Sequence, residues 1–376
     1  MTPMGEAHDL SVTLALCGDV MTGRGVDQVL PDPCPPTLYE SYIKDARDYV
    51  LLAEEVSGSI AQPVALSYPW GDMRAELASK SDVRIVNLET ALTRSADAWP
   101  GKGIHYRMSP ENSRMLTVAE IDCCTLANNH VLDWGRGGLE ETLRTLRGLG
   151  LRTAGAGTDR RDAEAPAEIN LVGGGRVLVF SFATWSSGVP ENWAASEAQS
   201  GVAFLPDLSQ ASEARVGELV KSHKRSGDLV VVSIHWGGNW GFTIPEDQRD
   251  FAHGLIKTGG VDVIHGHSSH HVKGIEVYRG RPILYGCGDF LNDYEGIGGH
   301  ESFRAELGFL YFVRLDSSGG ELLQLELIPT RINRLQVRRA DPEDVQWLAD
   351  TLNREGSRLG TSVVSAEGGH LELQWR

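Results

Sequence analysis

The sequence contains few cysteines, and none has the spacing of a thiolate metal site. The five cysteines lie at positions 17, 34, 123, 124 and 287 of a chain of 376 residues. The adjacent Cys123 and Cys124 would point to opposite faces of a strand, so they would not share an ion. An odd number of cysteines, several in or beside apolar runs, indicates reduced and buried thiols rather than a disulfide framework.

Positive charge is also scarce. The chain has 35 Lys and Arg against 51 Asp and Glu, which gives a net charge of −16. This balance disfavours a nucleic-acid partner, which would require a basic surface, and it disfavours docking on anionic lipid. A large polyanion would need a local basic groove, and the sequence shows no dense basic cluster.

No segment is apolar over a length that could span a bilayer. The run Val12–Cys17 is too short for the core of a signal peptide, and the residues before it, Met1 to Asp9, are polar. From these absences we expect a cytoplasmic protein with no membrane partner.

Apolar and β-branched runs alternate with helical patterns through most of the chain, which predicts an α/β fold. The predicted strands are Val12–Leu16, Val83–Asn87, Cys123–Leu126, Val177–Phe182, Leu229–Ile234, Val261–Ile264, Pro282–Tyr285, Phe309–Leu315 and Leu322–Ile328. The predicted helices are Tyr39–Val56, Ser113–Ala119, Leu139–Leu149, Ser209–His223, Asp247–Lys257 and Pro342–Leu352. A turn signal at 316–320 predicts a hairpin, and therefore a mixed sheet or a second sheet. We expect one domain over residues 1–330, with residues 331–376 as an extension packed on it.

Polar residues of metal-ligand type follow several of these strands. Asp19 and Glu89 each end a strand-like run, and an amide of the pair Asn128-Asn129 follows another. His267 and His270 belong to a group of four histidines in seven residues, which follows Val261–Ile264. Ligands bind beyond the carboxyl ends of strands in open α/β sheets, and this ligand chemistry suits Mn, Fe or Zn, often as a pair of ions. The alternative is ordinary turn chemistry, with Asp19 capping a turn and Glu89 at a surface strand end.

Other residues near these strand ends could act on a substrate. His130 could transfer a proton beside a metal, and Arg24 could bind an anion in the glycine-rich turn after Asp19. His300 lies in a further loop and could serve as a base, although an ordinary surface role is as plausible. His235 ends a strand and is followed by an aromatic loop that contains Trp236 and Trp240. A second long aromatic loop, Trp185–Gly201, has the length of a lid or a substrate wall.

Taken in order, these segments resemble the capsule-synthesis (CapA) family, a branch of the calcineurin-like metallophosphatase superfamily. The family pattern reads Gly-Asp-x-Met, Asn-Leu-Glu, Ala-Asn-Asn-His-x-x-Asp, His-Trp-Gly and a late Gly-His-x-Pro-His. The matching segments here are Gly18–Met21, Asn87–Glu89, Ala127–Asp133, His235–Gly237 and Gly266–His270. The resemblance implies a four-layer α-β-β-α sandwich with a site for two divalent metal ions.

By position, the resemblance makes six residues metal ligands and makes His130 the proton-transfer histidine. The six are Asp19, Glu89, Asn129, His235, His267 and His270. Two departures stand out. The usual Asp-x-His of the superfamily is Asp19-Val20-Met21 here, so one histidine ligand is absent, and Ser268-Ser269 replaces the family's His-Pro.

Three enzymatic functions are compatible with this pattern, and a non-catalytic binding protein is a fourth reading. We favour an epimerase that inverts the C-terminal residue of a ribosomal lasso-precursor peptide. His130 and His300 would act on the two faces of Cα, with Asp19 as a third candidate. Arg24, Trp185, Trp236 and Trp240 would contact the peptide. The alternatives are an enzyme of poly-γ-glutamate capsule synthesis or processing, and a metallophosphoesterase.

Overall fold

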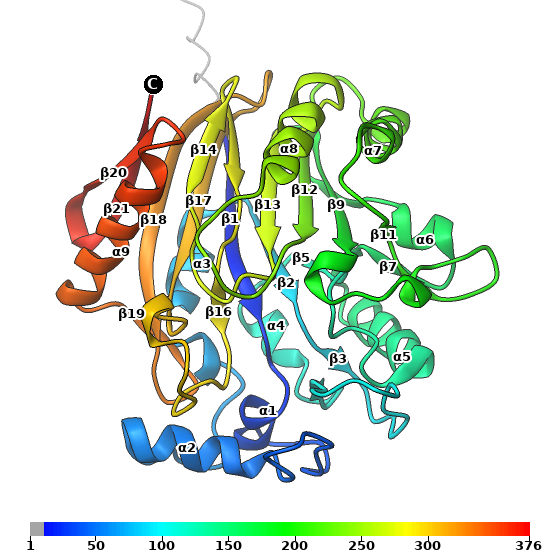
Figure 1. The fold of residues 1–376 in the computed structure, drawn as a ribbon, viewed down its shortest axis with the longest axis vertical. Coiled ribbons are helices and arrows are strands. Elements are labelled where there is room, and N and C mark those ends of the chain that lie inside the picture. Colours follow the sequence, from blue (N-terminus) through cyan, green and yellow to red (C-terminus); the bar gives the residue numbers. More distant parts are fainter. Residues whose placement is uncertain (1–10) are drawn as a thin grey trace, which may run out of the picture.

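The computed structural model describes residues 11–376, and the polar segment before residue 11 lies outside the described residues. Within that range, the first of two large sheets has ten strands (Figure 1). Eight strands form its main path, in the order β20 (Thr361–Ser365), β21 (Leu371–Trp375), β18 (Leu322–Ile332), β17 (Leu307–Asp316), β1 (Ser11–Val20), β2 (Val83–Leu88), β5 (Cys123–Thr125) and β6 (Arg152–Ala154). Two short strands complete it, since β16 (Asp289–Leu291) pairs with β1 and β19 (Val337–Arg339) pairs with β18.

The second large sheet has seven strands within the same described range. Its main path runs β11 (Phe204–Leu205), β9 (Arg176–Thr184), β12 (Leu229–His235), β13 (Val263–His267), β15 (Arg281–Leu284) and β14 (Ile275–Tyr278), and β8 (Ala167–Asn170) pairs with β9. Strands β9, β12 and β13 are parallel and buried along their whole length. Such burial on both faces explains why their sequences are continuous apolar runs rather than alternating ones.

Helices and short strand pairs connect the strands of the two large sheets. The helices are α1 (Gly25–Val29), α2 (Arg47–Ser57), α3 (Met73–Lys80), α4 (Arg114–Val118), α5 (Gly135–Gly148), α6 (Arg160–Glu164), α7 (Gln210–His223), α8 (Glu246–Thr258) and α9 (Pro342–Gly356). The short pairs are β3 (Ala91–Leu92) with β4 (Arg107–Met108), and β7 (Ala156–Gly157) with β10 (Gly201–Val202). In the part of the chain that the structure describes, no helix is long and apolar enough to cross a membrane.

Apolar side chains of the two sheets meet in one buried cluster. Leu14 and Leu16 of β1 belong to the same cluster as Val179 of β9 and Val231 of β12. Strand side chains alternate between faces, so Ala15 and Cys17 of β1 point the other way, into a cluster that includes Leu139 of α5. The facing surfaces of the two sheets therefore form the centre of the molecule.

A third cluster covers the outer face of the second sheet. Phe180 of β9 and Val232 of β12 pack there with Val216 of α7 and Leu255 of α8. Helices thus cover the outer face of each sheet, and the carboxyl ends of β1, β2, β12 and β13 lie between these layers (Figure 1). The α/β class expected from the sequence is confirmed.

All nine predicted strands are present, but one predicted helix begins late. The pattern predicts a helix over Tyr39–Val56, whereas α2 starts only at Arg47. The segment before it is not helical, and it carries the buried carboxylate of Glu40 to Arg24, with 2.9 Å between Oε1 and Nη1. A buried ion pair therefore overrides helix propensity at this point.

The tail after residue 330 adds to the first sheet. Strand β21 pairs with β18, and β20 pairs with β21. Helix α9 begins at a cap in which the Asp341 side chain accepts a hydrogen bond from the Asp344 backbone N–H, with Pro342 in the first turn. Its Leu348 and Leu352 belong to the cluster between the sheets. This segment closes one end of the central core.

Candidate metal centre

Three ligand-type side chains meet where strands of the two sheets end. Asp19 is near the end of β1, Glu89 directly follows β2, and His235 is the last residue of β12. Their ligand atoms all lie within 4.8 Å of one another, and all three side chains are buried. Parallel pairing of β1 with β2 brings the two carboxylates together, since the register places Asp19 beside Asn87.

A second group shares Asp19 and adds His270 and Asp289, again with ligand atoms within 4.8 Å of one another. Asp289 begins β16 and pairs directly with Asp19 in the register. Asp289 is not among the ligands expected from the sequence. A usable signal exists, because the tripeptide Cys-Gly-Asp occurs at 17–19 and again at 287–289.

Gly18 explains why these two segments can touch. Its neighbour Asp19 donates a backbone hydrogen bond to the Gly288 carbonyl at 2.9 Å. A Cβ added at Gly18 would lie only 1.9 Å from that carbonyl oxygen. The close approach of the two backbones therefore requires glycine at this position.

The two central carboxylates have opposite pKa shifts. Burial acts to raise the pKa of Asp19, but His267, whose Nδ1 lies 2.7 Å from Oδ1, together with His235 and Glu89 outweighs burial and lowers it. Burial, together with the charge of Asp19, raises the pKa of Glu89 well above its ordinary value. Two carboxylates this close cannot both ionise easily without a nearby positive charge. A divalent cation is the kind of group that would supply it.

Several buried ligand atoms in the described residues have no hydrogen-bond partner. These orphaned atoms are Glu89 Oε1, Asn129 Oδ1, His235 Nδ1 and His267 Nε2. Buried polar atoms nearly always find partners, so four orphans on residues of metal-ligand type require an explanation. Oxygen and imidazole donors of this kind fit Mn, Fe or Zn. The residues present therefore fit a metal centre.

The side chain of His270 contacts the carboxylate of Asp289. Its Nδ1 lies 2.9 Å from Asp289 Oδ1. Burial alone would lower the pKa of His270, but the Asp289 carboxylate outweighs burial and raises it. Asp289 is in turn bonded by Asn292 at 2.7 Å. The contact orients the imidazole of His270 beside the Asp289 carboxylate, which belongs to the same ligand group.

His130 lies beside this centre and is oriented by Asp133. Its Nδ1 is 2.6 Å from Asp133 Oδ2, and its Nε2 is 3.8 Å from Glu89 Oε1. Lys102 hydrogen-bonds both Asp133 and the backbone carbonyl of Asn129. Burial, together with the charge of Lys102, lowers the pKa of His130 to about 4. A neutral His130 with its Nδ1 bonded to Asp133 could accept a proton at Nε2.

Lys102 was not identified from the sequence. Its side chain is 18% exposed, and its Nζ lies 5.1 Å from the centroid of the Trp193 ring. The segment Gly101-Lys102-Gly103 has no strand or helix pattern that would place it beside His130. Only the tertiary fold shows that the contact exists.

Arg24, expected to bind an anion, is buried in an ion-pair network. Its guanidinium bonds Asp293 through Nε at 3.1 Å and Nη2 at 2.5 Å, and bonds Glu40 and the Tyr49 hydroxyl through Nη1 at 2.9 Å each. The side chain is only 1% exposed. Arg24 is therefore satisfied within the protein and offers little to a substrate.

The tryptophans expected to contact substrate differ in their surroundings. Trp185 is 72% exposed, whereas Trp236 is buried and donates to the Tyr285 carbonyl at 3.0 Å. Trp240 stacks on His300 with 3.9 Å between ring centroids, and its ring centroid is 5.6 Å from that of His270. Trp240 and His300 thus lie at the rim of the centre, while Trp236 belongs to the core of the second sheet.

The fold and the site define an α/β protein whose buried carboxylates and histidines gather at strand ends between two sheets. The chain belongs to the bacterial capsule synthesis protein family PGA_cap, whose pattern matches residues 13–294. This match confirms the family resemblance expected from the sequence motifs. It covers the residues of both ligand groups.

Known relatives agree with this membership. A Mycobacterium tuberculosis protein named as a probable polyglutamine synthesis accessory protein is 46% identical over 364 residues, which is 96% of this chain and 96% of the relative. The Bacillus subtilis "PGA biosynthesis protein CapA" is 26% identical over 302 residues, 78% of this chain and 66% of the relative. The Bacillus anthracis "Capsule biosynthesis protein CapA" is 25% identical over 295 residues, 78% and 62% respectively.

Proposed function

We propose that this chain is a metal-dependent enzyme of capsule-polymer synthesis that acts on the amide-linked glutamate chain. The observation that carries the proposal is the grouping of Asp19, Glu89 and His235 within the region that matches the capsule-synthesis family. The names of the relatives, which refer to polyglutamine and PGA synthesis, favour this substrate class over a lasso-precursor peptide.

Two divalent ions would occupy the centre, with the first held among Asp19, Glu89, Asn129, His235 and His267. Asp19, His270 and Asp289 would hold the second. When bound, such ions polarise a carbonyl group and stabilise negative charge that develops on its oxygen. This ligand set also supports a sandwich of the metallophosphatase type, in which Asp289 supplies a carboxylate although Met21 replaces the usual histidine.

The role of His130 is to move a proton at Nε2, which faces Glu89 across 3.8 Å. Asp133 fixes the orientation of the ring through Nδ1, and Lys102 holds Asp133 in place. The same arrangement occurs in enzymes in which a carboxylate keeps the imidazole of a general base in one tautomer. The polymer would approach past Trp240 at the rim, with the exposed Trp185 as a further candidate contact.

The peptide epimerase remains the second candidate. The observation that favours it is that Trp240 connects His300 to His270 by ring contacts, which brings a second histidine beside the candidate centre. Two proton carriers on different sides of one carbon are what inversion at Cα requires. A metallophosphoesterase ranks third, since no relative's name refers to a phosphoester.

The test is incubation of metal-loaded protein in heavy water with γ-linked glutamate oligomers and, separately, with linear peptides. Mass spectrometry would follow chain length and deuterium uptake. We expect a change in oligomer length that a chelator abolishes, that added Mn or Zn restores, and that Asp19→Asn removes. Asp350→Asn, an exposed change on α9, serves as the matched control. Uptake of one deuterium at the C-terminal residue of the peptides, with glutamate oligomers unchanged, would instead establish the epimerase.

A further inference from the structure

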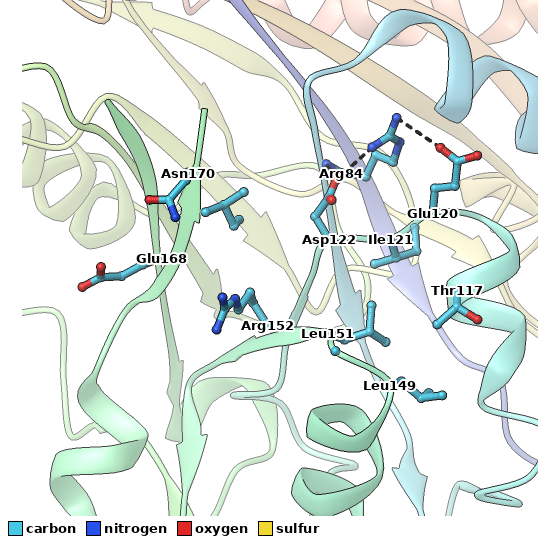
Figure 2. Close-up of a pocket in the computed structure, with 12 residues that line it drawn as sticks. Arg84, Thr117, Glu120, Ile121, Asp122, Leu149, Leu151, Arg152, Glu168 and Asn170 are labelled. Carbon is cyan, nitrogen blue, oxygen red and sulfur yellow. Dashed lines mark hydrogen bonds and ion pairs between the residues drawn. The ribbon is translucent and has the colours of Figure 1, made fainter. Parts of the chain in front are cut away.

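A surface hollow lies at the opposite ends of β2 and β5 from the candidate metal centre. Its walls include Arg84 near the start of β2, Asp122 just before β5, and Arg152 at the start of β6, and its volume is about 410 Å³. Figure 2 shows Arg152 between Glu168 on one side and the pair Arg84–Asp122 on the other. Asn129 and Glu89 follow the other ends of β5 and β2, so the hollow and the metal centre are separate places.

Two further hollows continue from the first. One, of about 420 Å³, is lined by both Arg152 and Arg147, and the next, also about 420 Å³, is lined by Arg147 and Arg161. We call this continuous surface, marked by Arg147, Arg152 and Arg161, the arginine groove. Helix α5, strand β6 and helix α6 each contribute one of the three. The sequence shows no dense basic cluster because these residues are separated along the chain and meet only through the fold.

The three arginines of the groove are exposed and free of ion pairs within residues 11–376. Within the described residues, Asp159 and Asp162 of the third hollow have no ion pair and accept hydrogen bonds from backbone N–H groups, whereas carboxylates of the first hollow are ion-paired. Asp122 pairs with Arg84 at 3.1 Å, and Glu168 pairs with Arg176 at 2.6 Å. In a chain of net charge −16, these three exposed arginines are cations that no carboxylate of the described residues neutralises through an ion pair.

The walls of the groove are also open strand edges. Within the described residues, β6 pairs only with β5, and β8 pairs only with β9. Thr153 of β6 and Ala167 of β8 line the same hollow. A strand edge presents backbone N–H and C=O groups that can pair with another polyamide chain. The groove therefore offers amide-pairing groups together with cations.

We propose that the arginine groove binds an acidic polyamide, the glutamate polymer, at a site separate from the metal centre. Guanidinium groups would pair with side carboxylates of the polymer, and the open edges would pair with its amides. The inference rests on the proposed function, because it takes the same polymer as ligand. Its consequence is that a long chain is held by the protein beyond the few units that fit at the metal centre.

The test is fluorescence anisotropy of labelled poly-γ-glutamate with the full-length chain. The groove variant combines Arg147→Glu, Arg152→Glu and Arg161→Glu. The matched control combines Arg114→Glu, Arg314→Glu and Arg358→Glu, which are exposed arginines elsewhere with the same total charge change. We expect the groove variant to weaken binding roughly tenfold or more and the control to weaken it much less.

Equal weakening by the two triple variants, or no binding by the wild type, would overturn the inference. So would equally tight binding of an uncharged glutamine oligomer, because the arginines would then be irrelevant. Polymer turnover separates this inference from the proposed function. If Asp19-dependent turnover persists while the groove variant binds normally, only the groove proposal fails. If the groove binds polymer and the wild type shows no turnover, only the catalytic proposal fails.

Discussion

Replacement of Arg24 by methionine should destabilise the protein strongly. The change removes four hydrogen bonds and leaves the carboxylates of Asp293 and Glu40, both 0% exposed, without their cation. It also removes a guanidinium that lies 3.9 Å from the centroid of the Tyr49 ring. Loss of one partner from a buried ion pair costs about 3–5 kcal/mol of unfolding free energy. We expect a loss in that range.

The assay is urea unfolding followed by tryptophan fluorescence, with two companion variants. Arg47→Met breaks an exposed ion pair with Asp45, in which the Arg47 side chain is 67% exposed, and should change the free energy of unfolding far less than Arg24→Met does. Adding Asp293→Asn to Arg24→Met should recover part of the loss, because one unpaired buried charge disappears. Equal stability of Arg24→Met and Arg47→Met would refute the reasoning. Normal stability of the Arg24→Met protein together with a raised KM would indicate that Arg24 binds the substrate.

Three further predictions concern single residues. Burial raises the pKa of Asp27 from 3.8 to about 6, so the stability from this group is complete below pH 3.8 and falls as pH rises through 6. Asp27→Asn should remove that part of the pH dependence of the unfolding free energy. Asp133→Asn should lower kcat about 100-fold or more with little change in KM, since His130 loses the group that orients it. Gly18→Ala should abolish metal binding and lower the melting temperature, because its Cβ would strike the Gly288 carbonyl; a fully metal-loaded Gly18→Ala protein would contradict the close approach.

The site residues that could be predicted from the sequence are those at the carboxyl ends of strands. Asp19, Glu89 and His235 follow apolar runs that form strands. Because parallel strands carry the residues at their carboxyl ends to one edge of a sheet, a polar residue after an apolar run is enough to place these side chains in the site. Asp289 follows no such run directly. It reaches the centre because Gly18 lets two Cys-Gly-Asp segments touch, and the repeated tripeptide is the signal in the sequence for this contact between distant segments.

The remaining misassignments arise from side-chain burial, which local pattern does not encode. Trp236 follows His235 into a loop and was expected to face substrate, yet it packs against Tyr285 in the second sheet. Arg24 follows Asp19 in a glycine-rich turn but is turned into the protein by Glu40 and Asp293. In both cases a partner far along the chain decides the direction of the side chain.

The central claim is that the strand-end carboxylates and histidines hold divalent metal. The most direct measurement is the metal content of purified protein that has been stripped, reloaded with Mn or Zn and dialysed. We expect about two ions per chain in the wild type and in Asp350→Asn, and a clear loss in Asp19→Asn, whose carboxylate belongs to both ligand groups. Absence of stoichiometric metal in the wild type, or an unchanged content in a folded Asp19→Asn protein, would contradict it.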